Sequence, residues 1–364
     1  MRIMFAGGGT GGHIYPALAI AEEIVKRQPD VKILFIAGSR EIELKIVRDA
    51  GFQIKTIQVS GLPRKVTLAL LPFAWKLVGS VVRSRQFIRD FRPSVVMATG
   101  GYIAGPPIIA AYIMGIPVAI QEQNSFPGIT NRKLGRFADI VFLGFHDAKK
   151  YFGHTVETMV TGNPVRNEIG TGFRDMSSAK FGLDPALKTV LVFGGSQGSH
   201  AINTAFSAIA GSLARDGIQL LWQTGEKEFG LYKKFHGQFN EKVKVLPYID
   251  DMMSAYASAD LVVSRAGAIT IAEITACGLP AIYIPLPTAT ANHQEHNARS
   301  LVNAGAAIMI LEKDLKPADL ECTIREIILS EERLRTMSKA SSKLCRKDAA
   351  HVIANVLIER YGIN

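Results

Sequence analysis

The sequence predicts an α/β fold of two doubly wound domains that face a cleft. Short apolar runs alternate with stretches of helical spacing, which is typical of a parallel sheet covered by helices. The Gly-, Pro- and Asn-rich segment 160–170 interrupts this alternation, which then restarts, and each half opens with an apolar run that leads into a glycine-rich loop. Because ligands of such sheets bind beyond the carboxyl ends of the strands, we expect the ligand site in the crevice between the domains.

The order of the apolar runs gives the expected elements. In the first half we expect a helix over 16–28 and strands within 2–9, 31–39, 94–101, 117–124 and 139–145. In the second half we expect a final helix over 349–362 and strands within 188–199, 219–225, 243–250, 260–267 and 280–287. The length of 364 residues suits two domains, since a domain usually has about 100–200 residues.

Composition and charge limit the class of protein. Hydrophobic residues make up 48% and charged residues 20%, as in an ordinary soluble protein. Three scattered cysteines form no CxxC and predict neither a disulfide framework nor a zinc site. The apolar run at the N-terminus is too short for a signal peptide, so we expect the cytoplasm. Most of the net charge of +10 lies in residues 1–165, where 20 Lys and Arg face 11 Asp and Glu, and this favours an anionic partner.

Residues 62–92 are basic and aromatic. They hold seven basic residues and one acidic residue, interleaved with Phe and Trp. The apolar part, residues 66–82, contains Pro72 and Lys76 and is shorter than the roughly 20 residues of a transmembrane helix. The composition suits a surface that lies in a membrane interface. A partly buried helical hairpin with solvated basic residues is the alternative.

The first glycine-rich loop, "GGGTGG" at residues 7–12, precedes His13. It formally matches GxGxxG, but a dinucleotide site also needs an acidic residue after the second strand. That strand ends in "FIAGSR" without an acid, and only Arg40 could accept a phosphate of NADP. A pyridine nucleotide is therefore a minor alternative.

Three later motifs suit a sugar nucleotide. In "GGSQGS", at residues 194–199, free amides at a helix start and the Ser196 hydroxyl could bind phosphate, unless the motif is only a tight turn. In "SRAGAITIAEITACGLP", Glu273 could accept hydrogen bonds from ribose hydroxyls or be a solvated helix residue. In "NHQEHNA", Gln294 and Asn297 suit sugar hydroxyls or helix capping.

No metal or cofactor is expected. The chain contains no DxD, and His13, His293 and His296 lack the neighbouring carboxylates of a metal site. The charge of a diphosphate would then have to be met by backbone amides, a helix dipole and Arg166.

These motifs together resemble one family. "GGTGGHIYPALA", "GGYIAGP", "QEQN", "GNPVR", "GGSQG", "RAGAITIAEI" and "NHQEHNA" stand in the order and at about the spacing found in the MurG family of bacterial glycosyltransferases, which act in peptidoglycan synthesis. The resemblance covers essentially the whole chain. It implies the GT-B fold of two Rossmann-like domains: residues 1–163 for the acceptor and membrane association, joined by a C-terminal helix of about 348–364, and residues 164–347 for the UDP-sugar donor.

The resemblance also implies a reaction. N-acetylglucosamine would pass from UDP-N-acetylglucosamine, with inversion, to the 4-hydroxyl of the muramyl sugar in undecaprenyl-diphospho-muramoylpentapeptide. The implied partners are this donor, the undecaprenyl-linked lipid and an anionic membrane surface, without nucleic acid. The implied location is the cytoplasmic face of the bacterial inner membrane, as a peripheral protein.

The family's site residues transfer to matching positions of this chain. The implied donor site consists of Thr10, Gly11, Gly12, Asn124, Arg166, Ser196, Ile249, Ala268, Ile269, Thr270, Ile271, Ala272, Glu273 and Gln294. The expected membrane face consists of Arg64, Lys65, Phe73, Trp75, Lys76, Arg83 and Arg85. Gln121, Ala104 and His296 depart from the residues expected in many relatives.

His13 is the candidate general base, since an imidazole suits proton transfer at neutral pH. It could instead only bind substrate or orient the loop, and Glu122 is the second candidate. Gly100, Gly101 and Tyr102 are expected to hold the acceptor diphosphate at another helix start. Three other functions remain open: a UDP-sugar transferase for another lipid such as diacylglycerol, a pyridine-nucleotide oxidoreductase, and a non-catalytic membrane-docking protein.

Overall fold

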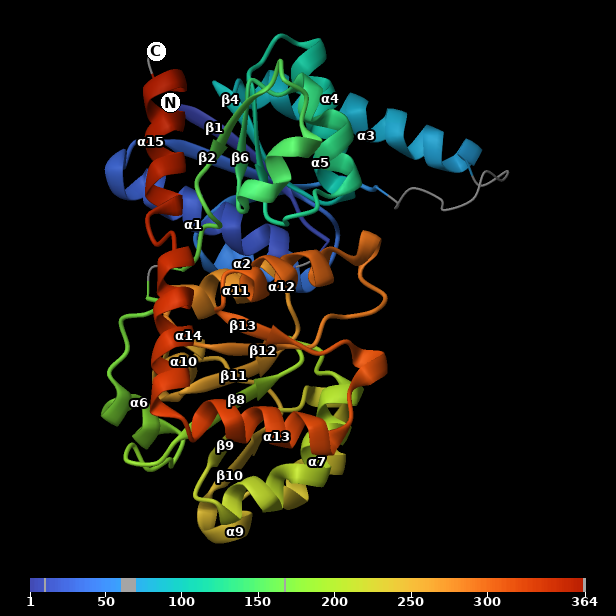
Figure 1. Cartoon of the computed structure of the whole chain (residues 1–364). Helices are drawn as coiled ribbons and strands as arrows, with labels where there is room; N and C mark the ends of the chain where they lie inside the picture. Colours follow the sequence, from blue (N-terminus) through green and yellow to red (C-terminus); the bar gives the residue numbers. More distant parts are fainter. Residues whose placement is uncertain (10, 60–69, 167, 363–364) are drawn as a thin grey trace. The chain divides into compact units, whose positions relative to one another are not determined.

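The computed structural model describes residues 1–9, 11–59, 70–166 and 168–362 of the chain. It divides into two compact units, and each is a parallel α/β sheet with helices on both faces (Figure 1). Unit 1 is Met1–Arg166 together with Arg346–Asn364, and unit 2 is Asn167–Cys345. The predicted α/β class of two doubly wound units is confirmed.

The described strands of unit 1 form one parallel sheet in the order β3-β2-β1-β4-β5-β6-β7. The strands are β1 (Arg2–Gly7), β2 (Lys32–Ala37), β3 (Gln53–Thr56), β4 (Val95–Gly100), β5 (Val118–Glu122), β6 (Ile140–Leu143) and β7 (Glu157–Val160). The helices are α1 (Gly11–Arg27), α2 (Glu41–Asp49), α3 (Leu70–Phe91), α4 (Gly105–Ile113), α5 (Ile129–Leu134) and α15 (Ala349–Tyr361), with short 3₁₀ turns η1 (Tyr102–Ala104), η2 (Gly135–Phe137) and η3 (His146–Tyr151).

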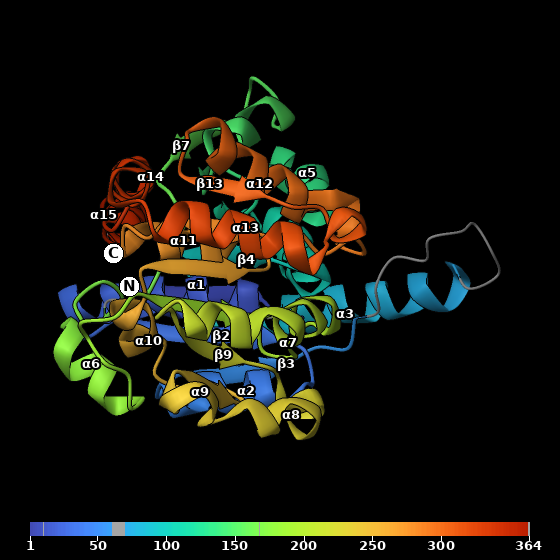
Figure 2. The same ribbon diagram turned by 60° about the horizontal axis from the view of Figure 1, so that its bottom comes forward.

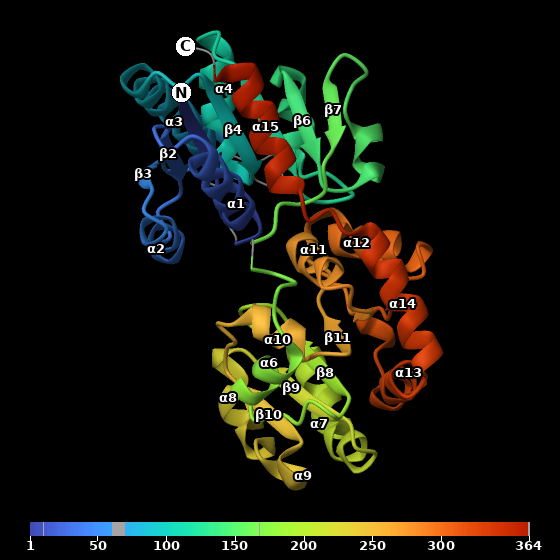
Figure 3. The same cartoon turned by 90° about the vertical axis from the view of Figure 1, so that its left-hand side faces the viewer.

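Both faces of this sheet are apolar because successive side chains of a strand point to opposite sides. Ile3 and Phe5 of β1 pack with α1 and α15, whereas Met4 and Ala6 pack with α4. The final helix α15 lies along α1 and buries Leu357 in the same core (Figure 3).

The described strands of unit 2 form a second parallel sheet in the order β10-β9-β8-β11-β12-β13. The strands are β8 (Thr189–Phe193), β9 (Gln219–Gln223), β10 (Val243–Leu246), β11 (Leu261–Ser264), β12 (Ala281–Tyr283) and β13 (Ala307–Met309). The helices are α6 (Arg174–Lys180), α7 (His200–Arg215), α8 (Glu226–Tyr232), α9 (Gln238–Glu241), α10 (Met252–Ser258), α11 (Ala268–Ala276), α12 (His293–Asn303), α13 (Pro317–Ile328) and α14 (Glu331–Leu344), with 3₁₀ turns η4 (Lys233–Phe235), η5 (Thr290–Asn292) and η6 (Glu312–Asp314). Figure 2 shows α7 and α13 from below.

Three short strands were missing from the sequence-based prediction. β3 and β7 lie at the two edges of their sheet, and β13 lies at an edge of the other. Neither β3 nor β7 is a continuous buried apolar run; β3 reads "QIKT" with its residues alternately exposed and half-buried. β3 and β7 are covered less than the central strands, and their sequences lack the apolar run that predicted the others. β13 lies in the apolar run 306–311 and was overlooked.

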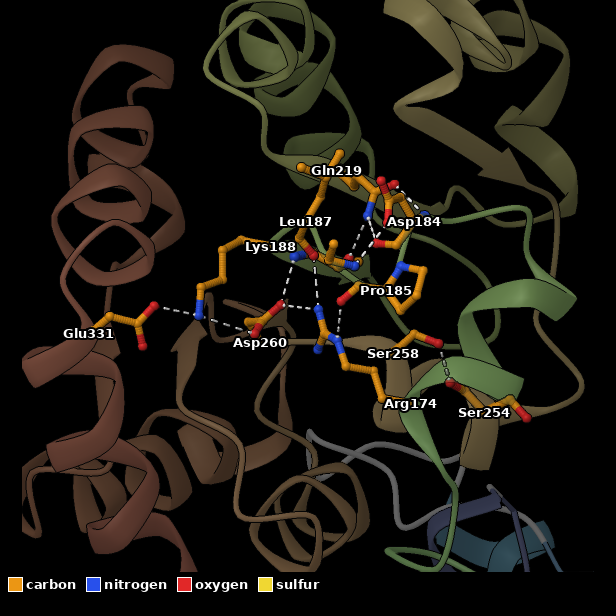
Figure 4. A network of polar contacts seen from close by, with 12 residues as sticks. Arg174, Asp184, Pro185, Leu187, Lys188, Gln219, Ser254, Ser258, Asp260 and Glu331 are labelled. Carbon is orange, nitrogen blue, oxygen red and sulfur yellow. Dashed lines mark hydrogen bonds and ion pairs between the residues drawn. The ribbon is translucent and has the colours of Figure 1, made fainter.

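The amino-terminal ends of the unit 2 strands carry a network of charged groups (Figure 4). Asp260, just before β11, accepts hydrogen bonds from Arg174 Nη2 at 2.9 Å and from the Thr189 backbone N–H at 2.8 Å. Lys188 lies 3.7 Å from Asp260 and 2.7 Å from Glu331 of α14. Contacts of this network therefore tie α6, β8, β11 and α14 together at the edge opposite the glycine-rich loops.

Candidate functional site

In both units the glycine-rich loops lie where the strand order reverses. In unit 1 the carboxyl ends of β1 and β4 are neighbours, and in unit 2 those of β8 and β11. Ligands of open α/β sheets bind at such switch points. The candidate residues therefore divide into a set on unit 1 and a set on unit 2, and each set is described within its own unit.

The first glycine-rich loop follows β1 and is held by α2 and its preceding residue. The Gly9 N–H donates to Glu43 Oε1 at 2.9 Å, and Arg40 Nη1 donates to the Gly9 carbonyl at 2.6 Å. Gly11 and Gly12 are exposed at the start of α1, whereas Thr10 lies outside the described residues. Glu43 is only 3% exposed and was missed, because it lies 34 residues from the loop and belongs to no recognised motif.

His13 is the third residue of α1 and is half-buried. Its Nδ1 lies 3.0 Å from the Thr99 carbonyl at the end of β4 and 3.2 Å from Gln123 Oε1 just after β5. Loops after three adjacent strands thus meet at this ring.

The second glycine-rich loop follows β4 and touches the first. Gly101 has a φ of 77°, and a Cβ on it would lie 2.2 Å from the Gly8 carbonyl oxygen, so only glycine fits. Gly100 packs against His13, since a Cβ on it would lie 3.0 Å from Nδ1. Tyr102 begins the turn η1 and is 43% exposed.

Glu122 ends β5 and is 1% exposed. Its carboxylate accepts hydrogen bonds from the Asn124 backbone and side chain, the Gly128 backbone and Asn131 Nδ2, all at 2.8–3.1 Å. Burial raises the pKa of Glu122 above its ordinary value, against the lowering effect of these hydrogen bonds. The carboxylate thereby fixes the turn that presents Asn124.

Arg166 is the last residue of unit 1 before the chain enters unit 2. Its guanidinium lies 5.7 Å from the centre of the Tyr15 ring on α1, a cation–π distance. Arg166 and the start of α1 are therefore neighbours within this unit.

The unit 2 loop after β8 is a tight turn that leads into α7. Ser196 is exposed in this turn, and Ser199 caps α7 by accepting a hydrogen bond from the Ile202 N–H at 3.4 Å. Gly198 has a φ of 75°, and a Cβ on it would lie 1.9 Å from the Thr224 carbonyl oxygen. The turn is thus packed closely against the loop after β9.

Glu273 lies in α11 with an exposed fraction of 9%, so it is not a solvated helix residue. Tyr256 Oη donates a hydrogen bond to its Oε2 at 3.0 Å. In the same helix Ala268 and Ile271 are buried, and Ile269, Thr270 and Ala272 are half-buried.

Ile249 is 2% exposed, and its N–H donates to Gln223 Oε1 at 2.8 Å. Gln223 Nε2 in turn donates to the Gly195 carbonyl at 3.0 Å. Gln294, at the start of α12, accepts a hydrogen bond from the Leu286 N–H at 3.0 Å. These amides join neighbouring loops at the carboxyl edge of the sheet.

Arg265, just after β11, is the residue of unit 2 that the prediction overlooked. Its guanidinium donates to Ser199 Oγ at 2.7 Å and to the carbonyls of Ile284 and Pro285 at 3.1 Å, and it pairs with Glu312. One side chain therefore connects the loops after β8, β11, β12 and β13. The quoted motif "SRAG" contains it, and an arginine directly after a predicted strand was the available indication in the sequence.

The membrane-face residues that the structure describes lie on α3. Trp75 is 78% exposed, and Lys76, Arg83 and Arg85 are exposed as well. Arg64, Lys65 and the Phe73 side chain lie outside the described part of the chain. The first turns of α3 project beyond the rest of unit 1 (Figures 1 and 2). Between residues 70 and 91 the chain is one helix rather than a hairpin.

No helix among the described residues is both long and apolar enough to cross a bilayer. No group of three or more His, Cys, Asp and Glu residues in the described ranges is placed to hold a metal ion.

Comparisons with known proteins match the chain over nearly its whole length. Residues 3–143 match the glycosyltransferase family 28 N-terminal domain, and residues 189–353 match the C-terminal domain of that family. An enzyme of Acetivibrio thermocellus named UDP-N-acetylglucosamine–N-acetylmuramyl-(pentapeptide) pyrophosphoryl-undecaprenol N-acetylglucosamine transferase is 41% identical over 98% of this chain and 97% of its own length. An enzyme of Desulforamulus reducens with the same name is 44% identical over 96% of both chains.

Solved structures agree. The crystal structure of Acinetobacter baumannii MurG has a TM-score of 0.78 at 26% identity and covers 98% of this chain and 99% of that one. A UDP-GlcNAc 2-epimerase from Neisseria meningitidis has a TM-score of 0.72 at 14% identity, covering 99% of this chain and all of the other, and this likeness concerns the fold alone.

Proposed function

The chain belongs to glycosyltransferase family 28, and we propose that it transfers N-acetylglucosamine from UDP-N-acetylglucosamine to the 4-hydroxyl of the muramyl sugar of undecaprenyl-diphospho-muramoylpentapeptide. The observation that carries this proposal is the identity of 41–44% over nearly the full length with enzymes named for that transfer. In the reaction the acceptor oxygen bonds to the anomeric carbon of the donor sugar. The bond from that carbon to the diphosphate breaks, and UDP leaves with the electron pair.

Unit 2 is the proposed donor domain. The buried Glu273 carboxylate is suited to accept hydrogen bonds from ribose hydroxyls. Ser196 and the amides of its turn, with the amino end of α7, are suited to a diphosphate. Ile249 packs against the uracil in this proposal and offers its carbonyl to the base edge, since its N–H already donates to Gln223. Gln294 faces the donor sugar.

Unit 1 is the proposed acceptor domain, and its match to the family's motifs adds residues that we propose for donor binding. Gly11, Gly12, Thr10, Asn124 and Arg166 complete the donor site in this proposal, Arg166 as a cation for the diphosphate. The loop of Gly100, Gly101 and Tyr102 holds the acceptor diphosphate. His13 is the proposed base, and it takes the proton of the acceptor hydroxyl.

His13 is preferred to Glu122 because of what surrounds each group. Glu122 already accepts four hydrogen bonds, three from the turn that follows it and one from Asn131 of α5. Both carboxylate oxygens are thereby occupied by donors of the protein itself, so neither is directed at an acceptor hydroxyl. The ring of His13 lies beside both glycine-rich loops.

The α3 surface is the proposed membrane contact, on the cytoplasmic face of the inner membrane. Trp75, Val78 and Val82 are all more than half exposed, and their spacing of three and four residues places them on one stripe. Exposed Lys76, Arg83 and Arg85 flank that stripe. The opposite stripe, which includes Ser80, Ser84 and Ile88, is buried. An apolar stripe bordered by cations suits an anionic lipid surface.

The membrane contact is tested by liposome sedimentation. Arg83→Gln with Arg85→Gln should weaken binding to anionic vesicles by roughly tenfold or more, since each basic residue near such a surface contributes about 1 kcal/mol. The matched control replaces Lys339 and Lys343, exposed on α14, with Gln. Equal losses in the two double variants would argue against a specific role of α3.

The transfer is tested with radiolabelled UDP-N-acetylglucosamine and a short-chain analogue of the muramyl lipid, with EDTA present. We expect product in EDTA, because the proposed diphosphate site is made of amides, a helix dipole and Arg166. Product only after magnesium is added would keep the reaction and overturn the metal-free site. If neither condition gives product, the acceptor assignment fails, and diacylglycerol is the next acceptor to test.

A further inference from the structure

A chain of buried side-chain amides in unit 1 ends on the ring of His13. We propose that Gln123 is a positioning residue: together with the Thr99 carbonyl it holds the His13 proton on Nδ1, so that Nε2 is the nitrogen that accepts the proton of the acceptor hydroxyl. This inference rests on the proposed function, in which His13 is the base. It adds which nitrogen acts and what selects it.

A backbone carbonyl fixes the orientation of the first side-chain amide, that of Asn163. Asn163 Nδ2 lies 2.9 Å from the Gln123 backbone carbonyl, which can only accept. The amide of Asn163 must therefore present its NH₂ group there and its oxygen on the other side. That oxygen receives a hydrogen bond from Gln121 Nε2 at 2.9 Å.

The orientation of the Asn163 amide in turn fixes the orientations of the Gln121 and Gln123 amides. Since Gln121 donates through Nε2, its oxygen faces Gln123 Nε2, which donates to it. The same Nε2 donates to the Thr99 carbonyl at 2.6 Å, a second group that can only accept. If the Gln123 amide were turned over, its oxygen would face the Thr99 carbonyl oxygen and Gln121 Oε1, and both hydrogen bonds would be lost.

The ring of His13 therefore meets two acceptors at one nitrogen. Gln123 Oε1 lies 3.2 Å from Nδ1, and the Thr99 carbonyl lies 3.0 Å from it. Only a protonated Nδ1 makes hydrogen bonds with both. In a neutral imidazole the other nitrogen, Nε2, then carries the lone pair.

Burial makes this arrangement cooperative. Gln121, Gln123 and Asn163 are 0%, 2% and 5% exposed, so water is not at hand to replace a lost partner. Turning one amide over would break hydrogen bonds on both of its sides. Gly144 makes room for the chain, since a Cβ on it would lie 2.2 Å from Asn163 Oδ1.

The arrangement also serves the charged state of the ring. After Nε2 takes the proton from the acceptor hydroxyl, the imidazolium keeps its Nδ1–H hydrogen bonds to Thr99 and Gln123. Hydrogen bonds from a charged donor are stronger than those from a neutral one, so these contacts favour proton uptake. The pair of acceptors thus both selects the tautomer and stabilises the product of the proton transfer.

The test is a nitrogen NMR spectrum of the full chain labelled with ¹⁵N-histidine, recorded well above the ordinary histidine pKa of about 6.5. The chain has eight histidines, and comparison with His13→Ala identifies the signals of His13. We expect a pyrrole-type shift for Nδ1 and a pyridine-type shift for Nε2. The opposite assignment would overturn the inference. This spectrum needs no substrate, so it is independent of the transfer assay.

A variant then tests Gln123 itself. Gln123→Met keeps the length of the side chain and removes both polar atoms. We expect the spectrum of this variant to show a smaller fraction of His13 protonated on Nδ1. kcat should fall about tenfold or more, as part of the roughly 10²–10⁴-fold contribution of a general base. KM for UDP-N-acetylglucosamine should stay within about twofold, because Gln123 acts on the base rather than on the donor.

The matched control is Gln219→Met in unit 2. Gln219 is also 2% exposed and hydrogen-bonded through its amide, to Asp184 and Thr189, but it lies at the start of β9 away from the glycine-rich loops. It should lower the melting temperature without changing the His13 spectrum. If Gln123→Met leaves both the spectrum and kcat unchanged, the role of Gln123 is overturned. If the spectrum shows the predicted tautomer but the protein has no transfer activity, the proposed function fails and the tautomer assignment stands.

Discussion

At the scale of single residues, neighbours decide what each buried carboxylate can do. Glu122 and Glu273 are both nearly inaccessible. Glu122 is surrounded by N–H donors of its own turn, whereas Glu273 receives the hydroxyl of Tyr256. The first arrangement stabilises a loop, and the second suits a carboxylate that binds further hydroxyls.

Glu273→Gln tests the ribose contact, because it keeps the shape of the side chain and removes its charge. Hydrogen bonds to a charged group contribute about 1.5–3 kcal/mol, so the Kd for UDP should rise roughly tenfold or more. Isothermal titration measures it. Glu332→Gln, an exposed change on α14, is the control and should bind UDP normally. An unchanged Kd in Glu273→Gln would remove the ribose role.

Arg265→Lys tests the clamp on the loops of unit 2. Lysine keeps the charge beside Glu312 but cannot reach Ser199, Ile284 and Pro285 together, because it lacks the planar fork of arginine. We expect weaker UDP binding and a lower melting temperature. A lysine variant that binds UDP like the wild type would show that the Arg265 contacts are not needed to position the glycine-rich turn after β8.

At the scale of elements, the carboxyl and amino ends of the unit 2 strands carry different side chains. The carboxyl edge carries the glycine-rich turn and Arg265. The amino edge carries the Asp260 network (Figure 4), beside a groove of about 640 Å³ that Lys188, Cys277 and Arg335 help to line. The charges drawn at this edge pair with one another across α6, β8, β11 and α14, so we assign them to stability.

The contact between α6 and α10 makes stability depend on pH. Asp251 caps α10 and accepts a hydrogen bond from Lys180 of α6 at 2.6 Å, which lowers the pKa of Asp251 to about 2. A lowered carboxyl pKa stabilises the fold above the unfolded value of 3.8, and this contribution is lost as the pH falls towards 2.

Urea unfolding of Asp251→Asn at several pH values checks this contact. The difference in unfolding free energy from the wild type should be constant above about pH 5 and shrink below it. With Lys180→Met in the background, that pH dependence should become much weaker. A difference that does not change down to about pH 3 would refute the assignment to this pair.

At the scale of the whole molecule, the chain ends in the unit where it began. It leaves unit 1 after Arg166 and returns at Arg346. The last helix, α15, then packs on α1 with Ile353, Ala354 and Leu357 in the core, and Arg360 pairs with Glu157, the first residue of β7. Residues at both ends of the sequence therefore share one core.

Leu357→Ala should destabilise unit 1 in particular. Leu357 is fully buried, and removing a buried leucine costs about 2–5 kcal/mol. Glu359→Ala, exposed on the same helix, is the control with an expected change within about 0.5 kcal/mol. Chemical denaturation monitored by hydrogen exchange locates the loss. Equal effects of the two changes would mean that α15 contributes little to this core.

Local patterns in the sequence were enough to predict the fold class, the central strands and the positions of the glycine-rich turns. These features follow from local patterns: a buried strand needs a continuous apolar run, and a sharp turn needs glycine. The edge strands β3 and β7 were missed because half-covered strands lack such a run, whereas β13 lies in the apolar run 306–311 and was overlooked.

Only the tertiary structure revealed the partners of the site residues. Glu43, Gln123, Asn163 and Arg265 each contact at least one group that lies between 34 and 110 positions away in the chain. Their contacts exist because parallel strands bring the ends of distant segments to one edge of a sheet. Hydrogen bonds between such segments leave no periodic pattern in the sequence, so folding alone decides which nitrogen of His13 faces the Thr99 carbonyl.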